Sequence, residues 1–342
     1  MILYYVNNSI HQIPSFIYIA LETGGKVLTD GKDSYALIKR DFPQIDVEFI
    51  ESLDAIRERA NELQPEAIVQ PDFWVNHLFA ECGGKQVQVF HGLSDKKYGR
   101  SKKVLLYDLV LLPGKKEEDA YRTMGILDKM KYQTVGYPKL DRVFQGKINQ
   151  EEQRIKLGLD PDKTTVLYAP TWNDRTGNTS YPKFGVEVLN QVPSDINLVV
   201  KLHPNTKSYD KKYYPILKEI AAKKDNILFI DYAADIIPIM ATADLLIGDI
   251  SSVTHEFMAF QRPLVFLDSG FHLFQRKART WIWQAGDVIK KKGQVWPTVL
   301  ERLEHPEEYA DIRQEILEYI FYKPDGNAAK RAAQAILEAS SV

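Results

Sequence analysis

Short apolar runs alternate with helical patterns along nearly the whole chain, and this alternation limits the possible folds more than any other feature. Continuous apolar runs are typical of strands buried on both faces, and a helix between consecutive strands makes those strands parallel. The pattern begins again after a connecting helix that Asn149 opens and Gly158 ends. We therefore predict an α/β fold with two Rossmann-type, doubly wound domains, residues 1–148 and 149–342, that face a central crevice.

The positions of the expected elements follow from these patterns. In the first half we expect strands at 2–6, 26–28, 46–50, 67–70, 87–90, 109–112 and 133–135. In the second half we expect strands at 165–168, 198–201, 227–230, 245–247 and 264–266. The clearest helical patterns are at 53–63, 116–123, 149–157, 213–223, 236–241 and 253–260. Ligands of such folds bind at the carboxyl ends of the strands, so the residues that follow each strand are the candidates for a site.

The charge balance and the cysteine content limit the class of function. The 342 residues include 44 Lys and Arg against 46 Asp and Glu, so no overall positive field attracts nucleic acid. A local basic cluster between Lys96 and Lys116 suits either a solvated surface or an anionic partner such as lipid head groups. Cys82 is the one cysteine, which excludes an intramolecular disulfide and favours a reducing, cytoplasmic setting.

The sequence lacks the motifs of several common chemistries. It contains no Walker loop, no Gly-x-Gly-x-x-Gly after the first strand, no His-Glu-x-x-His and no Gly-x-Ser-x-Gly. Nothing in the pattern requires a metal ion or another cofactor, so we predict none. No run approaches the roughly 20 apolar residues that span a bilayer, and the N-terminal apolar run is too short for a signal peptide. We therefore expect a chain that is soluble or bound peripherally to a membrane.

The stretch from Ala243 to Glu256 is a candidate for binding a phosphate. An apolar strand runs into Gly248 and Asp249, and Ser251 and Ser252 then open a helical pattern. The first N–H groups of a helix have no internal partner, and the positive end of its dipole favours a diphosphate. A simple capped helix start would show the same pattern, and on this stretch alone that alternative is favoured.

Two histidines follow predicted strands at corresponding points of the two halves. His91 precedes Gly92, which lets a ligand approach the backbone, and a histidine there can act as a general base. His203 precedes Pro204, which fixes the exit of the chain and directs His203 into the crevice. Either residue could instead be a structural histidine that bonds a nearby carbonyl. Their recurrence at the same topological point favours a shared site.

Further binding candidates lie beyond another strand and along the helix that follows the serine pair. Thr171, Trp172 and Arg175 offer hydroxyl, aromatic and guanidinium contacts to a substrate. For Trp172 the alternative is a structural role in packing one domain on the other. Glu256 lies one turn after Ser252 and is interpreted as binding ribose hydroxyls, with local helix capping as the alternative. We expect no such role for the remaining histidines, which are His11, His77, His255, His272 and His305.

A set of motifs in this order resembles the CDP-glycerol glycerophosphotransferase family, whose members build teichoic acid linkers and polymers. The set covers about residues 85–335 and comprises His91-Gly92 with Lys96-Lys97-x-Gly99, Tyr168-Ala169-Pro170-Thr171-Trp172, Lys201-x-His203-Pro204, Asp249-x-Ser251-Ser252, and Asp325-Gly326 with Arg331. The combined set is far more specific than any one motif. Phe90 and Leu93 depart from the Trp and Thr that the family usually shows around its His-Gly pair.

The resemblance implies a GT-B-like fold and a particular reaction. Glycerol phosphate, or a related polyol phosphate, would pass from a CDP-activated donor to a hydroxyl acceptor, with release of CMP. His91 matches the proposed catalytic base of the family, and His203 matches the histidine that contacts the donor pyrophosphate. Ser251 and Ser252 match the serines that hold the donor phosphate. The other residues that we place near the donor are Thr171, Arg262 and Arg331.

Other functions stay open on the same fold, because a fold does not determine a function. A nucleotide-sugar glycosyltransferase or a UDP-GlcNAc 2-epimerase-like enzyme is one alternative, and a non-catalytic module that binds a sugar nucleotide is another. Family members act on lipid-linked acceptors at the cytoplasmic membrane face. The basic cluster would then contact the inner face of the membrane, gaining about 1 kcal/mol per charge near an anionic leaflet.

Overall fold

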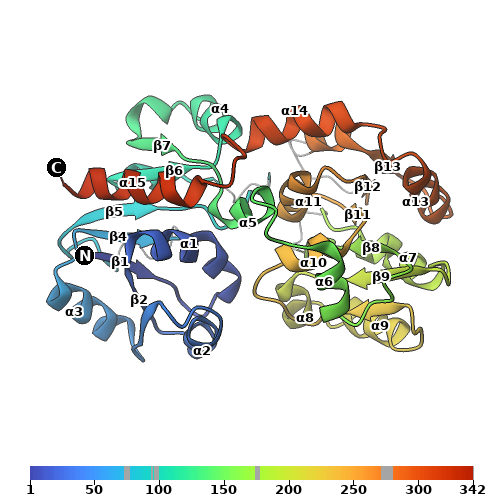
Figure 1. Ribbon diagram of the computed structural model, residues 1–342, viewed down its shortest axis with the longest axis horizontal. Helices are drawn as coiled ribbons and strands as arrows, with labels where there is room; N and C mark the ends of the chain where they lie inside the picture. The colour runs from blue at the N-terminus through green and yellow to red at the C-terminus, as the bar shows by residue number, and fades with distance from the viewer. Residues whose placement is uncertain (73–77, 94, 96–99, 174–177, 271–279, 342) are drawn as a thin grey trace. The chain divides into compact units, whose positions relative to one another are not determined.

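The computed structural model describes residues 1–72, 78–93, 95, 100–173, 178–270 and 280–341. It divides into two compact units (Figure 1). The first unit comprises Met1–Gly92, Arg100–Gln145 and Glu318–Val342, and the second comprises Leu93–Gly99 and Gly146–Leu317. The predicted division at 148/149 therefore differs at its C-terminal end, because residues 318–342 group with the first unit rather than the second.

The first unit contains a seven-stranded parallel sheet with the order β3-β2-β1-β4-β5-β6-β7. Its strands are β1 (Ile2–Tyr5), β2 (Lys26–Thr29), β3 (Asp46–Phe49), β4 (Ala67–Gln70), β5 (Lys85–Gln88), β6 (Leu109–Leu112) and β7 (Tyr132–Thr134). All seven positions expected from the apolar runs correspond to these strands. The strand order reverses between β1 and β4, and ligands of doubly wound sheets bind at the carboxyl ends beside such a switch point.

Helices complete the first unit, and the last of them comes from the far end of the chain. They are α1 (Ile13–Thr23), α2 (Lys32–Asp41), α3 (Leu53–Leu63), α4 (Lys115–Thr123), α5 (Asp141–Phe144) and α15 (Ala328–Ser340). In Figure 1 α15 runs beside β5 and β6, and it also packs against α1. Its alanines and Ile336 are buried in this position, which explains why the C-terminal segment groups with the first sheet.

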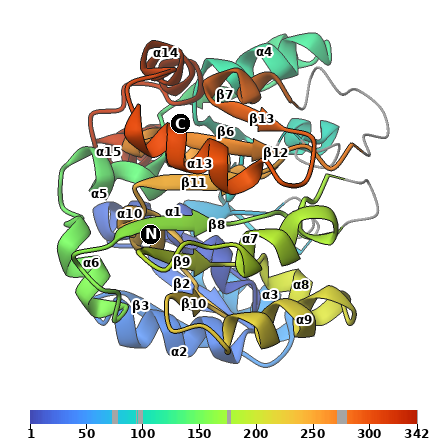
Figure 2. The same ribbon diagram turned by 90° about the vertical axis from the view of Figure 1, so that its right-hand side faces the viewer.

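The second unit contains a six-stranded parallel sheet with the order β10-β9-β8-β11-β12-β13. Its strands are β8 (Thr164–Tyr168), β9 (Ile196–Val200), β10 (Ile227–Phe229), β11 (Leu245–Gly248), β12 (Leu264–Leu267) and β13 (Asp287–Ile289). Counted from β8, this is the Rossmann order 3-2-1-4-5-6, and Figure 2 shows the strands following one another in it. Its switch point lies between β8 and β11, and β13 is the one strand of this sheet that the sequence patterns did not predict.

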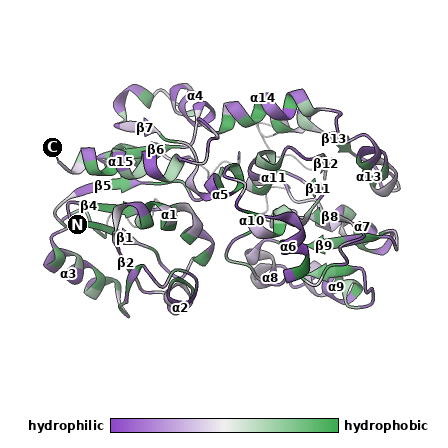
Figure 3. Ribbon diagram, in the orientation of Figure 1, coloured by the Kyte–Doolittle hydropathy of each residue, from purple (hydrophilic) through white to green (hydrophobic). Residues whose placement is uncertain are grey.

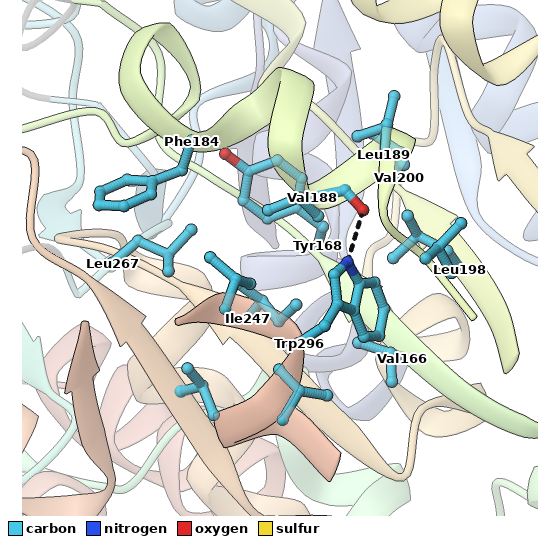
Figure 4. Close-up of a cluster of buried hydrophobic side chains, with 14 of the residues drawn as sticks. Val166, Tyr168, Phe184, Val188, Leu189, Leu198, Val200, Ile247, Leu267 and Trp296 are labelled. Carbon is cyan, nitrogen blue, oxygen red and sulfur yellow. Dashed lines mark hydrogen bonds between the residues drawn. The ribbon is translucent and has the colours of Figure 1, made fainter. Parts of the chain in front are cut away.

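The helices of the second unit surround a continuous apolar core. They are α6 (Gln150–Lys156), α7 (Val186–Asn190), α8 (Pro204–Tyr209), α9 (Tyr213–Ala221), α10 (Ile237–Thr242), α11 (Ser252–Phe257), α13 (Val295–Glu304) and α14 (Ala310–Ile320), of which α14 extends to the boundary between the units. Figure 4 shows Trp296 of α13 against Val166 of β8, with its indole N–H donating to the Val188 carbonyl at 3.0 Å. The strands are largely green in Figure 3 whereas α6, which buries no residue, is largely purple. Rows of Val, Ile and Leu buried on both faces therefore form the sheet, as the apolar runs predicted.

A set of backbone contacts fixes the C-terminal segment to the first unit. Gly114 approaches this segment so closely that a Cβ would lie 2.2 Å from the Ile320 carbonyl oxygen, so any larger residue would displace the backbone. The Asp141 carboxylate accepts hydrogen bonds from the N–H groups of Ala328 and Ala329, at 3.0 and 2.7 Å, and so caps α15.

Among the described residues, no helix is both long enough and apolar enough to cross a membrane.

Candidate functional site

A buried carboxylate, Asp249, organises the carboxyl edge of the second sheet at its switch point. Asp249 follows β11 directly and is fully buried. Its Oδ1 accepts a hydrogen bond from the Thr171 N–H at 2.9 Å, and its Oδ2 accepts from the N–H and the hydroxyl of Ser180 at 2.8 and 2.9 Å. Asp249 therefore holds residues on both sides of segment 174–177, which is outside the described residues and contains the predicted Arg175.

The segment after β8 brings Trp172 against His203 from the neighbouring β9. Their rings stack with centroids 6.1 Å apart at an interplanar angle of 29°, and the ring of Tyr209 lies 5.8 Å from that of Trp172. Thr171 is buried, and its carbonyl accepts a hydrogen bond from the Thr179 hydroxyl at 2.7 Å. The structure thus brings together three of the predicted residues, Thr171, Trp172 and His203, within the second unit.

The ring of His203 has a defined role at the start of α8. Its Nδ1 accepts a hydrogen bond from the Asn205 N–H at 3.2 Å, so His203 is the N-cap of this helix. Because Nδ1 is the acceptor, the neutral ring carries its hydrogen on Nε2. His203 is therefore a hydrogen-bond donor through Nε2, the property that an anionic oxygen requires.

The serine pair begins the short helix α11. Ser251 is its N-cap, with extended φ and ψ of −141° and 152°, and its Oγ accepts a hydrogen bond from the Val253 N–H at 3.2 Å. The capping that the sequence indicated is thus present, and the Ser251 hydroxyl still has its own hydrogen to donate. Ser252 is the first helical residue and is half-buried, whereas Glu256 in the next turn is 2% exposed.

A buried lysine lies at the carboxyl end of β9, and the sequence analysis assigned no role to it. Lys201 is 4% exposed, and its Nζ donates to the Leu202 carbonyl at 2.8 Å. Burial lowers the pKa of Lys201 to about 8, although the negative charge of Asp231 acts in the opposite direction. Burying the charged Lys201 side chain costs free energy, so a cation kept at this position, two residues before His203, suits the binding of an anionic ligand. Its signal in the sequence was a charged residue at the end of an otherwise apolar run.

We expect Lys201→Met to raise the stability of the unliganded protein near pH 7 by about 2–3 kcal/mol, as each pKa unit corresponds to roughly 1.4 kcal/mol. Below about pH 8 both the folded and the unfolded wild type carry the proton, so the folded state bears the full cost of the buried charge. Between about pH 8 and the ordinary pKa of 10.5, only the unfolded chain keeps the Lys201 proton. The free energy of unfolding of the wild type therefore rises over this range, and the stability difference between Lys201→Met and wild type becomes smaller. Urea denaturation of both proteins at pH 7 and pH 9 measures this. An advantage that does not change with pH would contradict it.

In the first unit, His91 follows β5 and lies near the carboxyl end of β4. Its Nδ1 is 2.6 Å from the Pro71 carbonyl oxygen, just beyond β4. A carbonyl can only accept, so Nδ1 carries the hydrogen and Nε2 is the basic nitrogen of the neutral ring. The ring of His11, to which the sequence analysis assigned no role, is 5.9 Å from the His91 ring in an edge-on arrangement. The flanking Phe90 and Leu93, which depart from the family pattern, are both buried.

The structure does not bring Arg262 to the predicted donor site. Its guanidinium donates to the carbonyls of Ala241 and Ala243 at 2.7 and 2.6 Å and to the Gln150 side chain at 3.2 Å. These partners precede β11, at the amino edge of the sheet, whereas the other donor candidates lie at the carboxyl edge. Arg262 thus connects α6, α10 and β11, and this structural role corrects its placement near the donor.

Arg331 lies on α15 in the first unit, not in a C-terminal donor domain. Its guanidinium donates to both carboxylate oxygens of Asp325 at 2.9 Å, to the Val135 carbonyl at 2.8 Å and to the Lys323 carbonyl at 3.0 Å. Burial acts to raise the pKa of Asp325, but the hydrogen bonds from Arg331 outweigh it and lower that pKa. The Asp325-Gly326 and Arg331 motif therefore attaches the C-terminal helix to the end of β7.

The predicted basic cluster is partly neutralised. Arg100 forms a two-pronged ion pair with Glu117, at 2.7 and 2.8 Å. Lys116 is 4% exposed, with its Nζ 3.5 Å from the same carboxylate. The other described basic residues between 100 and 116 are Lys102, Lys103 and Lys115. Lys96 and Lys97 are outside the described residues.

A group of three side chains around α11 was not predicted from the sequence. The Asp95 carboxylate accepts hydrogen bonds from the His255 ring at 2.8 Å and from the Trp281 indole at 2.7 Å. All three residues belong to the second unit. In the described part of the chain, no three His, Cys, Asp or Glu side chains are grouped so that they could hold a metal ion.

Two Rossmann sheets with polar residues beyond the carboxyl ends of their strands define a GT-B-like α/β protein, as predicted. Solved structures confirm this fold. The Wall Teichoic Acid Polymerase TagF matches with a TM-score of 0.72 at 17% identity, over 99% of this chain and 88% of that one. UDP-GlcNAc 2-epimerase from Neisseria meningitidis matches with a TM-score of 0.71 at 13% identity, over 99% of this chain and 100% of that one.

The sequence comparisons are more specific than the fold. The model of the CDP-Glycerol:Poly(glycerophosphate) glycerophosphotransferase family matches residues 51–338, so the chain belongs to this family, as its motifs indicated. It is 28% identical to a teichoic acid poly(glycerol phosphate) polymerase of Bacillus spizizenii, over 51% of this chain and 45% of that protein. It is 23% identical to a teichoic acid glycerol-phosphate transferase of Staphylococcus aureus, over 70% and 63% respectively. The chain thus spans less than two thirds of the length of these relatives.

Proposed function

We propose that this protein transfers glycerol phosphate, or a related polyol phosphate, from a CDP-activated donor to a hydroxyl acceptor in cell-wall or capsular polymer synthesis. The observation that carries the proposal is the family match, which covers strands β4 to β7 of the first sheet, the whole second sheet and every motif from His91 to Arg331. The donor is CDP-glycerol or CDP-ribitol, and the acceptor is a growing or nascent teichoic acid-type chain. The two relatives named above are a poly(glycerol phosphate) polymerase and a glycerol-phosphate transferase, in line with this assignment.

The hydrogen bonds of the two histidines support different roles for them. The Pro71 carbonyl accepts from Nδ1 of His91, which leaves Nε2 able to take up a proton. The Asn205 N–H donates to Nδ1 of His203, which leaves the hydrogen on Nε2. The first ring is thus suited to a general base and the second to a donor toward an anionic oxygen. Local backbone geometry therefore selects opposite tautomers for the two rings.

In the proposed reaction, the acceptor oxygen forms a bond to the phosphorus that carries the glycerol. The bond from that phosphorus to the bridging oxygen breaks, and CMP leaves with the electron pair. Nε2 of His91 takes the hydroxyl proton, while Nε2–H of His203 and the Ser251 hydroxyl donate to the pyrophosphate oxygens. We propose that Lys201 offsets charge at the same place and that Trp172 limits how the donor can lie beside His203. We propose that Glu256 and Ser252 have the predicted roles of binding ribose and donor phosphate, and that Gly92 lets a ligand approach the backbone.

The released nucleotide tests this function. The purified protein is incubated separately with CDP-glycerol, CDP-ribitol and UDP-GlcNAc, with and without a polyol-phosphate-primed acceptor, and thermal shift and released nucleotide are measured. We expect a CDP-polyol to raise the melting temperature and CMP to appear once an acceptor is present. Release of a nucleoside diphosphate from a UDP-sugar would instead indicate a glycosyltransferase. Binding without consumption of any donor would indicate a non-catalytic module.

A short helical turn adds an apolar contribution to the proposed membrane contact. The turn η2 (Lys102–Leu106) exposes Leu105 and Leu106 by 38% and 58%, next to Lys102 and Lys103. We expect the protein to sediment with anionic vesicles at low salt and to be released at high salt, because surface charges are screened within about 8–10 Å at physiological salt. At about 1 kcal/mol per charge, Lys102→Glu should weaken binding several-fold or more, and Leu106→Ser should weaken it at both salt concentrations. If the protein does not bind anionic vesicles at low salt, the proposed membrane contact is wrong.

A further inference from the structure

The three-residue group around Asp95 connects the segment after His91-Gly92 to the second unit. Asp95 follows Gly92 by three positions in the sequence. Gly92 is the last residue of that stretch to belong to the first unit, and residues 93–99 belong to the second. Side chains that hold Asp95 therefore act on the chain directly beyond the proposed catalytic base.

Asp95 and His255 form a buried pair in which both nitrogens of the His255 ring face an oxygen atom. Their side chains are 4% and 2% exposed. Nδ1 of His255 faces the Ser251 carbonyl at 3.0 Å, and Nε2 faces Oδ2 of Asp95 at 2.8 Å. A backbone carbonyl and a carboxylate both accept, so each nitrogen of the His255 ring faces a hydrogen-bond acceptor. Removing either side chain leaves a buried polar partner without its hydrogen bond, so the pair is specific in geometry.

Trp281 adds a second donor and a third segment of chain. Its indole N–H donates to the same Oδ2 of Asp95 at 2.7 Å, and its ring lies 6.0 Å from that of His255. Trp281 begins the turn η7 (Trp281–Ala285), while His255 lies in the same short helix that Ser251 caps. Asp95 is thus held by the helix of the proposed donor-phosphate serines and by a separate turn.

We infer that Asp95 is a positioning residue, which through His255 and Trp281 sets the course of the chain beyond His91 and so the placement of the base. The inference rests on the proposed function, because it concerns the base of that reaction. His255 also contacts the carbonyl of Ser251, so the ring that holds Asp95 belongs to the helix of the proposed donor serines. Asp95 itself touches none of the reacting atoms in this scheme.

The test combines kinetics with a probe of the anchor that needs no activity. The variants are Asp95→Ala, His255→Ala and the double variant, with Asp95→Asn as a milder change that keeps an acceptor for Trp281. Asp287→Ala is the matched control, because the Asp287 carboxylate also accepts a hydrogen bond from a buried side chain, Arg302 at 2.8 Å, but at the amino end of β13. The measurements are kcat, the KM for CDP-glycerol, and the rate of trypsin cleavage after Lys96 and Lys97, which directly follow Asp95.

We expect Asp95→Ala to lower kcat by about 10- to 100-fold, the effect of misplacing a catalytic group by an ångström or less, with the donor KM within about twofold of wild type. Trypsin cleavage should become about tenfold faster, and the double variant should be no worse than the more impaired single variant. Asp95→Asn should be intermediate, and Asp287→Ala should affect thermal stability only. If Asp95→Ala and Asp95→Asn match Asp287→Ala in kcat and cleavage rate, the inference is overturned. If wild type releases no CMP from any CDP-polyol, the proposed function fails, and the cleavage rates alone decide whether the anchor exists.

Discussion

Replacing His91 by alanine is expected to lower kcat by about 10²- to 10⁴-fold, the usual contribution of a positioned general base. The Pro71 carbonyl, 2.6 Å from Nδ1, holds the ring with Nε2 as its basic nitrogen, and alanine offers no replacement for that atom. The affinity for CDP-glycerol should change little, because the proposed donor contacts belong to the second unit. Steady-state release of CMP and isothermal titration with CDP-glycerol measure the two quantities separately.

An exposed histidine provides the matched control for this experiment. The side chain of His305 is 60% exposed, so His305→Ala should leave both kcat and donor affinity unchanged. His11→Gln tests whether the neighbouring ring supports His91, and we expect a smaller loss of kcat than for His91→Ala. Near-normal turnover of a folded His91→Ala protein that binds donor normally would show that another group removes the proton.

The sheets could largely be predicted from the sequence, because parallel strands buried on both faces must be apolar runs. All the expected strands are present. The connecting helix α6 begins at Gln150, and Asn149 is its N-cap, with a side chain that accepts from the Glu152 N–H at 2.9 Å. The strand β13 (Asp287–Ile289) was not predicted, although the equally short β7 and β10 were, so its length alone does not explain the omission. An edge strand of this length is defined by its pairing with β12, which the local sequence does not encode.

The return of the C-terminal helix to the first unit could not be predicted either. A helical pattern identifies an apolar face, but it does not identify the surface that covers that face. Asp141 and Gly114 determine the surface here, and they lie about 180 to 200 positions before their partners in the chain. Arg331 was consequently assigned to the wrong unit.

The candidate site, too, could be predicted only where the local sequence determines it. The positions of His91 and His203 beyond strand ends were apparent from the sequence, whereas their tautomers depend on Pro71 and on the first turn of α8. His255 was dismissed because its partner Asp95 is 160 residues away and nothing local indicates the pairing. Arg262 was misassigned because a buried arginine that binds carbonyls looks, in sequence, like one that binds phosphate.

Asp249→Asn should be the most disruptive conservative change in the second unit. The wild-type carboxylate accepts from the Thr171 N–H, the Ser180 N–H and the Ser180 hydroxyl. In either orientation of the asparagine, its NH₂ group faces a backbone N–H, so one donor opposes another. Hydrogen bonds to a charged group contribute about 1.5–3 kcal/mol each, and an unsatisfied buried donor costs about 1–3 kcal/mol. We therefore expect a loss of about 3 kcal/mol in the free energy of unfolding, measured by urea denaturation.

The same variant should also weaken donor binding, because Asp249 holds the segment that places Trp172 against His203. A displaced Trp172 would lose its stacking with the His203 ring, whose centroid is 6.1 Å away. We expect the Kd for CDP-glycerol to rise by about tenfold or more, because small displacements of groups that position a ligand are costly. Ser180→Ala is the graded control, because it removes the hydroxyl bonds to Asp249 and Tyr168 but keeps both backbone N–H bonds. It should cost about 1 kcal/mol of stability and little affinity. Lost donor binding at full stability in Asp249→Asn would mean that this carboxylate acts on the donor itself, not through the segment after β8.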